Sequence, residues 1–191
     1  SKVNNCSSSG SVTGGTYNTG GLVGSAGDGS SINTSYATGN VTAENGDYVG
    51  GFIGYVDSTM GGDFNRVRLE DLSIYGGDYV GGLVGQFNAA KPLTNSYVKN
   101  ALVYGNNYVG GLFGDITAAG SSLTKCGATN AVVMAAEDMT GGIAGRSRAA
   151  SSAYCYNTST ADAKVIVIDE ADGEYSLSAE YIGNHFSNSD E

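Results

Sequence analysis

The sequence contains no Trp, one Pro and one His among its 191 residues. It also has no long apolar run. The apolar stretches are short, as in Val165 to Ile168, whereas a membrane-spanning helix needs about 20 such residues. The single histidine, His185, provides no histidine cluster for a metal ion and no sign of a Ser-His-Asp triad. We therefore expect no metal site, no cofactor, no catalytic residue and no membrane insertion.

Basic residues are scarce as well. Nine Lys and Arg against 19 Asp and Glu give a net charge of -10. Such a chain repels phosphate backbones, so we expect no nucleic-acid partner. Apolar residues at 40% and charged residues at 15% are typical of a folded domain. The chain starts in mid-pattern without Met, so we expect a piece of a longer protein.

Glycine is abundant, with 31 residues, and much of it lies in a repeat. Gly-Gly, two apolar residues and Gly recur five times, and the copies start 29 to 31 residues apart. The copies are Gly20–Gly24, Gly50–Gly54, Gly81–Gly85, Gly110–Gly114 and Gly141–Gly145. A degenerate sixth copy is Glu180–Gly183. Repeats at such a period indicate a stacked architecture.

A second block follows each glycine motif, as in Ile32–Tyr36 and Leu93–Tyr97. The segments around it are rich in Val, Ile, Tyr and Thr and are bounded by Gly, Asn and Asp, which favours short strands. We expect the loops at 25–31, 57–63, 88–91, 117–122 and 146–151. The pattern predicts an all-β solenoid, parallel β-helix-like, of five to six turns of about 30 residues. It covers residues 1–157, and residues 158–191 form an irregular last turn and C-terminal cap of the same domain.

Equivalent residues of successive turns would lie about 4.8 Å apart and form columns. Three columns of small or apolar residues are predicted to face the core. They are Cys6, Ser35, Val67, Ser96, Cys126 and Cys155; Val49, Val80, Val109, Thr140 and Ile182; and Val23, Ile53, Val84, Phe113 and Ala144. We expect the Gly pairs to be corners, because glycine adopts positive φ and lets neighbouring turns approach closely. The motif strand is either apolar on both faces or kinked at Gly-Gly.

The segments Tyr79–Gly85 and Asn33–Val41 resemble the GLUG-motif repeat of bacterial cell-surface proteins. That repeat occurs in haemagglutinin-like adhesins and in non-catalytic regions of immunoglobulin A1 peptidases. The resemblance covers about residues 1–157. It implies a β-solenoid on the bacterial surface or secreted, and it brings no catalytic residues, because the motif is structural.

Tyr48, Tyr79 and Tyr108 are the candidate binding residues, because they form an aromatic column with Tyr181 beyond the gap. Facing solvent, the column would suit sugars or a protein partner; facing inward, it would be core. An acidic column precedes it, consisting of Asp47, Asp78, Asn107, Asp138 and Glu180. Its carboxylates would either cap bends through their own backbone or share calcium.

Two smaller features have alternatives. Cys126 and Cys155 occupy the same column in adjacent turns. They form either a disulfide or two reduced thiols in the core. Arg66 and Arg68 lie near Glu70 as a solvated charge cluster.

The function expected is that of a non-catalytic extracellular repeat module, structural or adhesive, with a host protein or glycan as partner. The alternatives are a carbohydrate-binding solenoid and a spacer region of a secreted peptidase or glycan-processing enzyme. A catalytic solenoid would need paired carboxylates or basic residues beside acids in a groove, and the nine basic residues are scattered.

Overall fold

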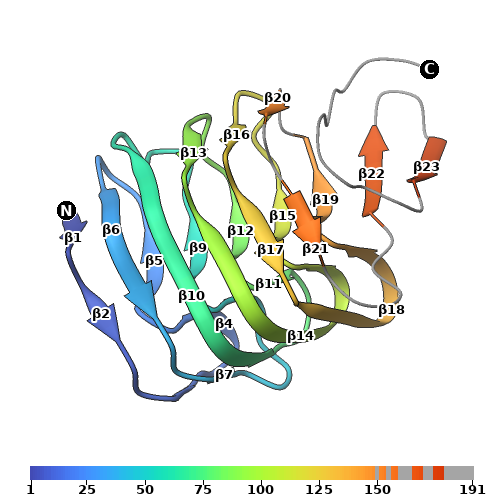
Figure 1. Cartoon of the computed structure of the whole chain (residues 1–191), viewed down its shortest axis with the longest axis horizontal. Coiled ribbons are helices and arrows are strands. Elements are labelled where there is room, and N and C mark those ends of the chain that lie inside the picture. The colour runs from blue at the N-terminus through green and yellow to red at the C-terminus, as the bar shows by residue number, and fades with distance from the viewer. Residues whose placement is uncertain (149–150, 154–155, 159–164, 170–173, 179–191) are drawn as a thin grey trace.

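The computed structural model describes residues 1–148, 151–153, 156–158, 165–169 and 174–178. These ranges contain strands and no helix, so the described residues include no helix long and apolar enough to cross a membrane. The strands coil into about five turns that stack along one axis (Figure 1). The predicted β-solenoid is therefore confirmed.

Each turn contributes three to five strands. The first two turns consist of β1 (Lys2–Asn4), β2 (Ser7–Ser8), β3 (Val12–Thr13), β4 (Tyr17–Gly20), β5 (Val23–Ala26), β6 (Ser31–Ala37), β7 (Val41–Thr42), β8 (Asp47–Gly50) and β9 (Ile53–Val56). The third and fourth consist of β10 (Phe64–Tyr75), β11 (Val80–Gly81), β12 (Val84–Phe87), β13 (Pro92–Thr94), β14 (Tyr97–Gly110) and β15 (Phe113–Ile116). The fifth and the strands beyond it are β16 (Ser122–Thr124), β17 (Gly127–Thr129), β18 (Val132–Gly141), β19 (Ala144–Ser147), β20 (Ser151–Ala153), β21 (Tyr156–Thr158), β22 (Val165–Asp169) and β23 (Glu174–Ser178).

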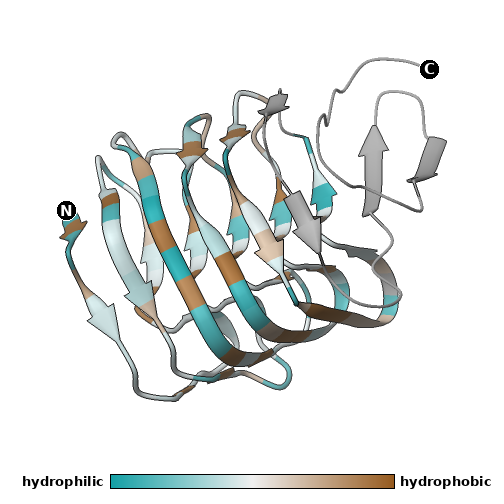
Figure 2. Ribbon diagram, viewed as in Figure 1, coloured by the Kyte–Doolittle hydropathy of each residue, from teal (hydrophilic) through white to brown (hydrophobic). Residues whose placement is uncertain are grey.

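Two parallel sheets enclose the core. The described strands form a large sheet of 16 strands and a small sheet in the order β19-β15-β12-β9-β5. Hydropathy alternates along β10 and β14, which places one set of side chains inside and the other in solvent (Figure 2). Beyond the coil, β22 and β23 pair antiparallel, and β22 lies beside β19.

The predicted columns are in register. Val80 pairs with Val49 and with Val109, and Val84 pairs with Ile53 and Phe113. All six side chains are buried. Like residues therefore stack on like residues along the axis, as the repeat predicts.

The serines of the column that contains Ser35, Ser96 and Cys126 also form hydrogen bonds between turns. The Ser96 hydroxyl donates to the carbonyl of Thr94 at 2.9 Å and accepts the Val67 N–H of the neighbouring turn at 3.1 Å. Between them, the backbone of Asn95 has φ of 52°. The hydroxyl therefore replaces the backbone hydrogen bonds that the sheet loses at the bend. Ser35 and its neighbours repeat this arrangement.

The Gly pairs are corners, and the chain kinks there. Between β11 and β12 the chain passes from the large sheet to the small one at Gly81 and Gly82. The kinked alternative is therefore confirmed, and Leu83 on the corner is buried. The expected reason for the glycines was wrong in part: among the described glycines only Gly29 has a positive φ, of 66°.

The corner glycines leave room for the backbone of adjacent segments to pack closely. A Cβ on Gly81 would overlap the carbonyl oxygen of Val84 and lie 2.7 Å from the Leu112 oxygen of the next turn. A Cβ on Gly82 would overlap the carbonyl oxygen of Gly111. Backbone thus packs directly on backbone at the corner, and any side chain there would push the turns apart.

Four loops lie where they were expected, at residues 27–30, 57–63, 88–91 and 117–121. The fifth, expected at 146–151, is shorter, because Arg146 and Ser147 lie in β19 and Ser151 in β20, and residues 149–150 lie outside the described residues. The predictions on Cys155, Glu180, Tyr181, Ile182 and His185 also lie outside them. Cys126 is buried, and its thiol lies 3.4 Å from the carbonyls of Leu93 and Thr124. Whether it pairs with Cys155 stays a prediction.

Candidate functional site

The structure places the three candidate tyrosines on the outer surface, half-buried, at the end of the large sheet next to the corner. Their backbones are left-handed, with φ of 58° at Tyr48, 59° at Tyr79 and 54° at Tyr108. A bulky residue rarely adopts this conformation. The backbone of Tyr79 packs against Gly114 of the neighbouring turn, where a Cβ would overlap it, so glycine there makes room for this backbone. Asn18 holds the same conformation at the equivalent place in the first turn.

The three rings form a continuous stack, here called the tyrosine ladder. Ring centroids are 5.0 Å apart between Tyr48 and Tyr79 and 4.7 Å apart between Tyr79 and Tyr108, with interplanar angles of 19° and 1°. The Arg146 guanidinium lies 4.5 Å from the Tyr108 centroid and covers the last ring. The ring faces therefore contact one another, and each of the three residues keeps part of its surface in solvent.

Burial raises the pKa of the Tyr48 hydroxyl above its ordinary value, and the neighbouring Asp47 raises it further. Burial also raises the pKa of Tyr79; the neighbouring Tyr108 adds to this and the positive charge of Arg146 opposes it. Both phenols are thus neutral hydrogen-bond donors throughout the physiological pH range.

A titration tests this environment. Tyr48 and Tyr79 are expected to ionise above the ordinary tyrosine pKa of about 10. Because the folded-state pKa is the higher one, the stability it contributes is complete below about pH 10 and is lost as pH rises through the folded pKa. The measurement is an ultraviolet absorbance titration of the protein minus that of Tyr79→Asn. A difference component at or below the midpoint of the free amino acid derivative would contradict the burial of the ring.

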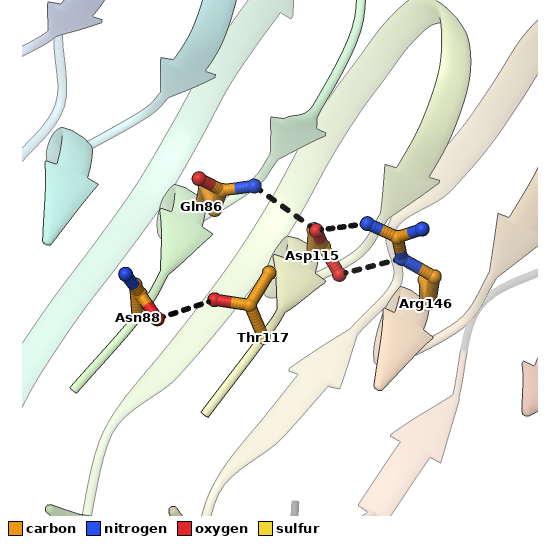
Figure 3. A network of polar contacts seen from close by, with 5 residues as sticks. All are labelled: Gln86, Asn88, Asp115, Thr117 and Arg146. Atoms are coloured by element: carbon orange, nitrogen blue, oxygen red, sulfur yellow. Dashed lines mark hydrogen bonds and ion pairs between the residues drawn. The ribbon is translucent and has the colours of Figure 1, made fainter. Parts of the chain in front are cut away.

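A buried ion pair lies beside the ladder (Figure 3). Asp115 in β15 has no exposed side-chain surface, and its carboxylate accepts Nε–H and Nη2–H bonds from Arg146 in β19 at 3.0 and 2.7 Å. On its other side, Gln86 in β12 donates to the carboxylate at 3.0 Å. Arg146 thus joins this row to the ladder, because it contacts both Asp115 and Tyr108.

The sequence reasoning missed this row. Its residues form the column Ser25, Tyr55, Gln86, Asp115 and Arg146, which follows the third glycine of each motif. A signal was present, since an acid and a base stand at the same position of adjacent repeats.

The acidic column caps bends, but not those of its own residues. A carboxylate oxygen of Asp47 accepts the backbone N–H of Asp78 at 3.2 Å, and Asp78 accepts that of Asn107 at 3.3 Å. Each side chain therefore stabilises the next turn of the coil, which corrects the expected capping of its own backbone. The described residues contain no group of three or more His, Cys, Asp or Glu arranged to hold a metal ion.

Arg66 and Arg68 line a groove of about 540 Å³ on the outer face of the large sheet, together with Tyr36 and Tyr97. Both arginines are exposed. Tyr97 raises the pKa of the Arg68 guanidinium, Glu70 adds to the rise, and the Tyr97 hydroxyl donates to Glu70 at 3.2 Å. The predicted solvated cluster is thus the wall of a concave surface.

A family model described as the GLUG motif matches residues 15–42. No curated protein and no solved structure matches the chain. The matched segment runs through β4, β5, β6 and β7 and is one circuit of the coil. The following turns pair with it in register and repeat its Gly-Gly corner. This chain is a repeat protein that carries the GLUG motif.

Proposed function

We propose that the chain is a non-catalytic repeat module of an extracellular bacterial surface protein, which acts as a stiff structural rod and adheres to a host or matrix protein through the tyrosine ladder. Five turns at about 4.8 Å each give a rod of about 25 Å. Its in-register backbone packing favours rigidity. The GLUG motif and its resemblance to surface-protein repeats support the extracellular place.

The observation that carries the adhesive role is the stack of three half-buried tyrosines on the outer surface. Tyrosine is enriched in the energetically important centres of protein interfaces, because it offers a large apolar ring with a polar tip. In the ladder the rings are already held by stacking at 4.7 and 5.0 Å, so binding would immobilise little that is free.

The test is adhesion of the triple variant Tyr48→Asn, Tyr79→Asn, Tyr108→Asn. Asn tolerates left-handed φ, and Asn18 already occupies this place in the first turn, so the variant is expected to fold. We expect the protein to bind at least one of immobilised fibronectin, laminin and collagen, and the variant to lose that binding at least about tenfold while circular dichroism is unchanged.

Binding that the variant retains in full would contradict the role of the ladder. If the unmodified protein binds none of the three matrix proteins, the adhesive role to such proteins is wrong and the structural one stands. Tyr75→Ser serves as the matched control, since Tyr75 is exposed and lies outside the ladder.

A further inference from the structure

The groove on the large sheet lies on a different surface from the ladder, and its shape comes from a second column of left-handed residues. Thr34, Arg66 and Asn95 have φ of 48°, 54° and 52° at equivalent places of successive turns. Each bends its strand at the same height, so the bends align into a trough that runs along the solenoid axis. At about 540 Å³ the trough has the size of an ordinary ligand site.

The groove is locally positive in an acidic protein. Arg66 and Arg68 are exposed, and neither forms an ion pair with a described residue. Lys125, also exposed, follows Thr124 as Asn95 follows Thr94, and so continues the row of bends two turns beyond Arg66. Glu70 acts electrostatically on Arg68, and the Tyr97 hydroxyl already donates to Glu70. A guanidinium without an ion-pair partner offers a forked donor that fits a carboxylate or a sulfate.

Aromatic surface lies next to these charges. Arg68 pairs in register with Tyr36 on one side and with Tyr97 on the other. Its guanidinium is 6.0 Å from the centroid of the Tyr36 ring, which is 44% exposed. Unlike the rings of the ladder, Tyr36 has no aromatic ring stacked on it among the described residues, so Arg68 lies over one face and the opposite face has no aromatic partner.

The backbone around the groove favours a sugar over an extended peptide as the ligand. An extended peptide gains affinity by adding main-chain hydrogen bonds at a sheet edge. Here the groove lies on a sheet face, where the Tyr36 N–H bonds to Cys6 and the Asn95 N–H to Thr124 in the adjacent turns. What remains for a ligand is side chains: guanidinium groups, an aromatic face and amides. These suit the charged groups, ring faces and hydroxyls of a sugar chain.

We propose that this groove binds a linear anionic oligosaccharide along the solenoid axis, with its carboxylate or sulfate groups on Arg66 and Arg68 and one sugar ring on the face of Tyr36. This site is independent of the tyrosine ladder. It gives the rod a second kind of partner, an acidic glycan, on the opposite end of the strands from the Gly-Gly corners.

The experiment is calorimetric titration of the whole chain with three probes: hexagalacturonate, its fully methyl-esterified form, and a chondroitin sulfate hexasaccharide. The ester keeps the sugar chain and removes only the charge. We expect binding of at least one acidic probe and none of the ester, with affinity that falls as salt is added. Preference between the two acidic probes distinguishes carboxylate from sulfate as the group recognised.

Three variants locate the site. Arg66→Asn, which keeps a residue suited to left-handed φ, and Arg68→Gln are each expected to weaken binding on the order of 10-fold to 100-fold. Lys91→Gln removes one positive charge from the loop between β12 and β13 and is expected to leave the affinity unchanged. The triple asparagine variant of the ladder is expected to bind the glycan normally, which keeps this result separate from the adhesion test.

The proposal is overturned if neither acidic probe binds, if the methyl ester binds as tightly as the acid, or if Lys91→Gln weakens binding as much as Arg68→Gln. Circular dichroism of each variant establishes that it is folded. Tyr36→Ser provides a further readout, since loss of the aromatic face is expected to weaken both acidic probes without changing the salt dependence.

Discussion

Gly81→Ala is expected to destabilise the solenoid by more than about 4 kcal/mol, enough to unfold it or to shift its denaturation midpoint far down. The new Cβ would overlap the carbonyl oxygen of Val84 and lie 2.7 Å from both the Leu112 oxygen and the Gly114 nitrogen. These three atoms are backbone, so no side-chain rotation relieves the overlap. Relief requires the corner at Val84 to distort and the next turn to move away, which breaks backbone hydrogen bonds between turns and opens the core beneath.

The sequence offers a matched control in Gly15, where an added Cβ meets nothing within 4 Å and φ is not positive. Gly15→Ala is expected to be neutral or to stabilise by about 0.4 to 1 kcal/mol, because alanine restricts the unfolded chain. Urea denaturation followed by circular dichroism measures both. A loss of less than about 1 kcal/mol in Gly81→Ala would show that the corner yields and that glycine is not required there.

The inward columns were predictable because a solenoid stacks equivalent residues directly on one another. Val49, Val80 and Val109 lie in one ladder for the same reason that they recur at a constant spacing in the sequence. The Gly-Gly corner was placed correctly for a similar reason. Its physical basis was only half right, because close backbone approach is needed at Gly81 and positive φ is not.

The left-handed columns were not predictable from residue type. Positive φ is expected at Gly and Asn, yet it occurs at Tyr79, Arg66 and Thr34. At Tyr79 the bare α-carbon of Gly114 in the adjacent turn makes room for this backbone, and local propensity carries no trace of that contact. These bends shape both the tyrosine ladder and the groove. The residues of the two candidate sites could therefore be identified from the sequence, but the shape of the surfaces that they form could not.

The row that contains Asp115 was missed for a different reason. The other columns were recognised because they repeat similar residue types. The row of Gln86, Asp115 and Arg146 instead combines an amide, an acid and a base, which bond to one another across turns. Such a row is visible in an alignment of repeats only when complementary charge is sought at the repeat spacing, which is 31 residues for Asp115 and Arg146.

Arg146→Met is expected to destabilise the protein by about 3 kcal/mol, because it leaves the carboxylate of Asp115 buried with Gln86 as its remaining described partner. The value is at the low end for a broken buried pair, since Arg146 is itself 17% exposed and water can enter in its place. Urea denaturation is the measurement. Arg68→Met removes an exposed arginine without an ion pair among the described residues, and is expected to cost less than about 0.5 kcal/mol.

The double variant Asp115→Asn, Arg146→Met decides whether the unpaired charge is the cause. Asn keeps the size of the side chain and its bond from Gln86 but carries no charge, so we expect the double variant to recover more than half of the lost stability. Equal loss in the single and double variants would instead assign the effect to the packing of Arg146 on Tyr108. The tyrosine ladder provides a second readout. Because the charge of Arg146 lowers the pKa of Tyr79, its removal is expected to move the Tyr79 ionisation to higher pH in the single variant, and by less in the double variant, because the charge of Asp115 raises that pKa and is lost as well. A Tyr79 titration unchanged by the loss of Arg146 would mean that the ion pair and the ladder act independently.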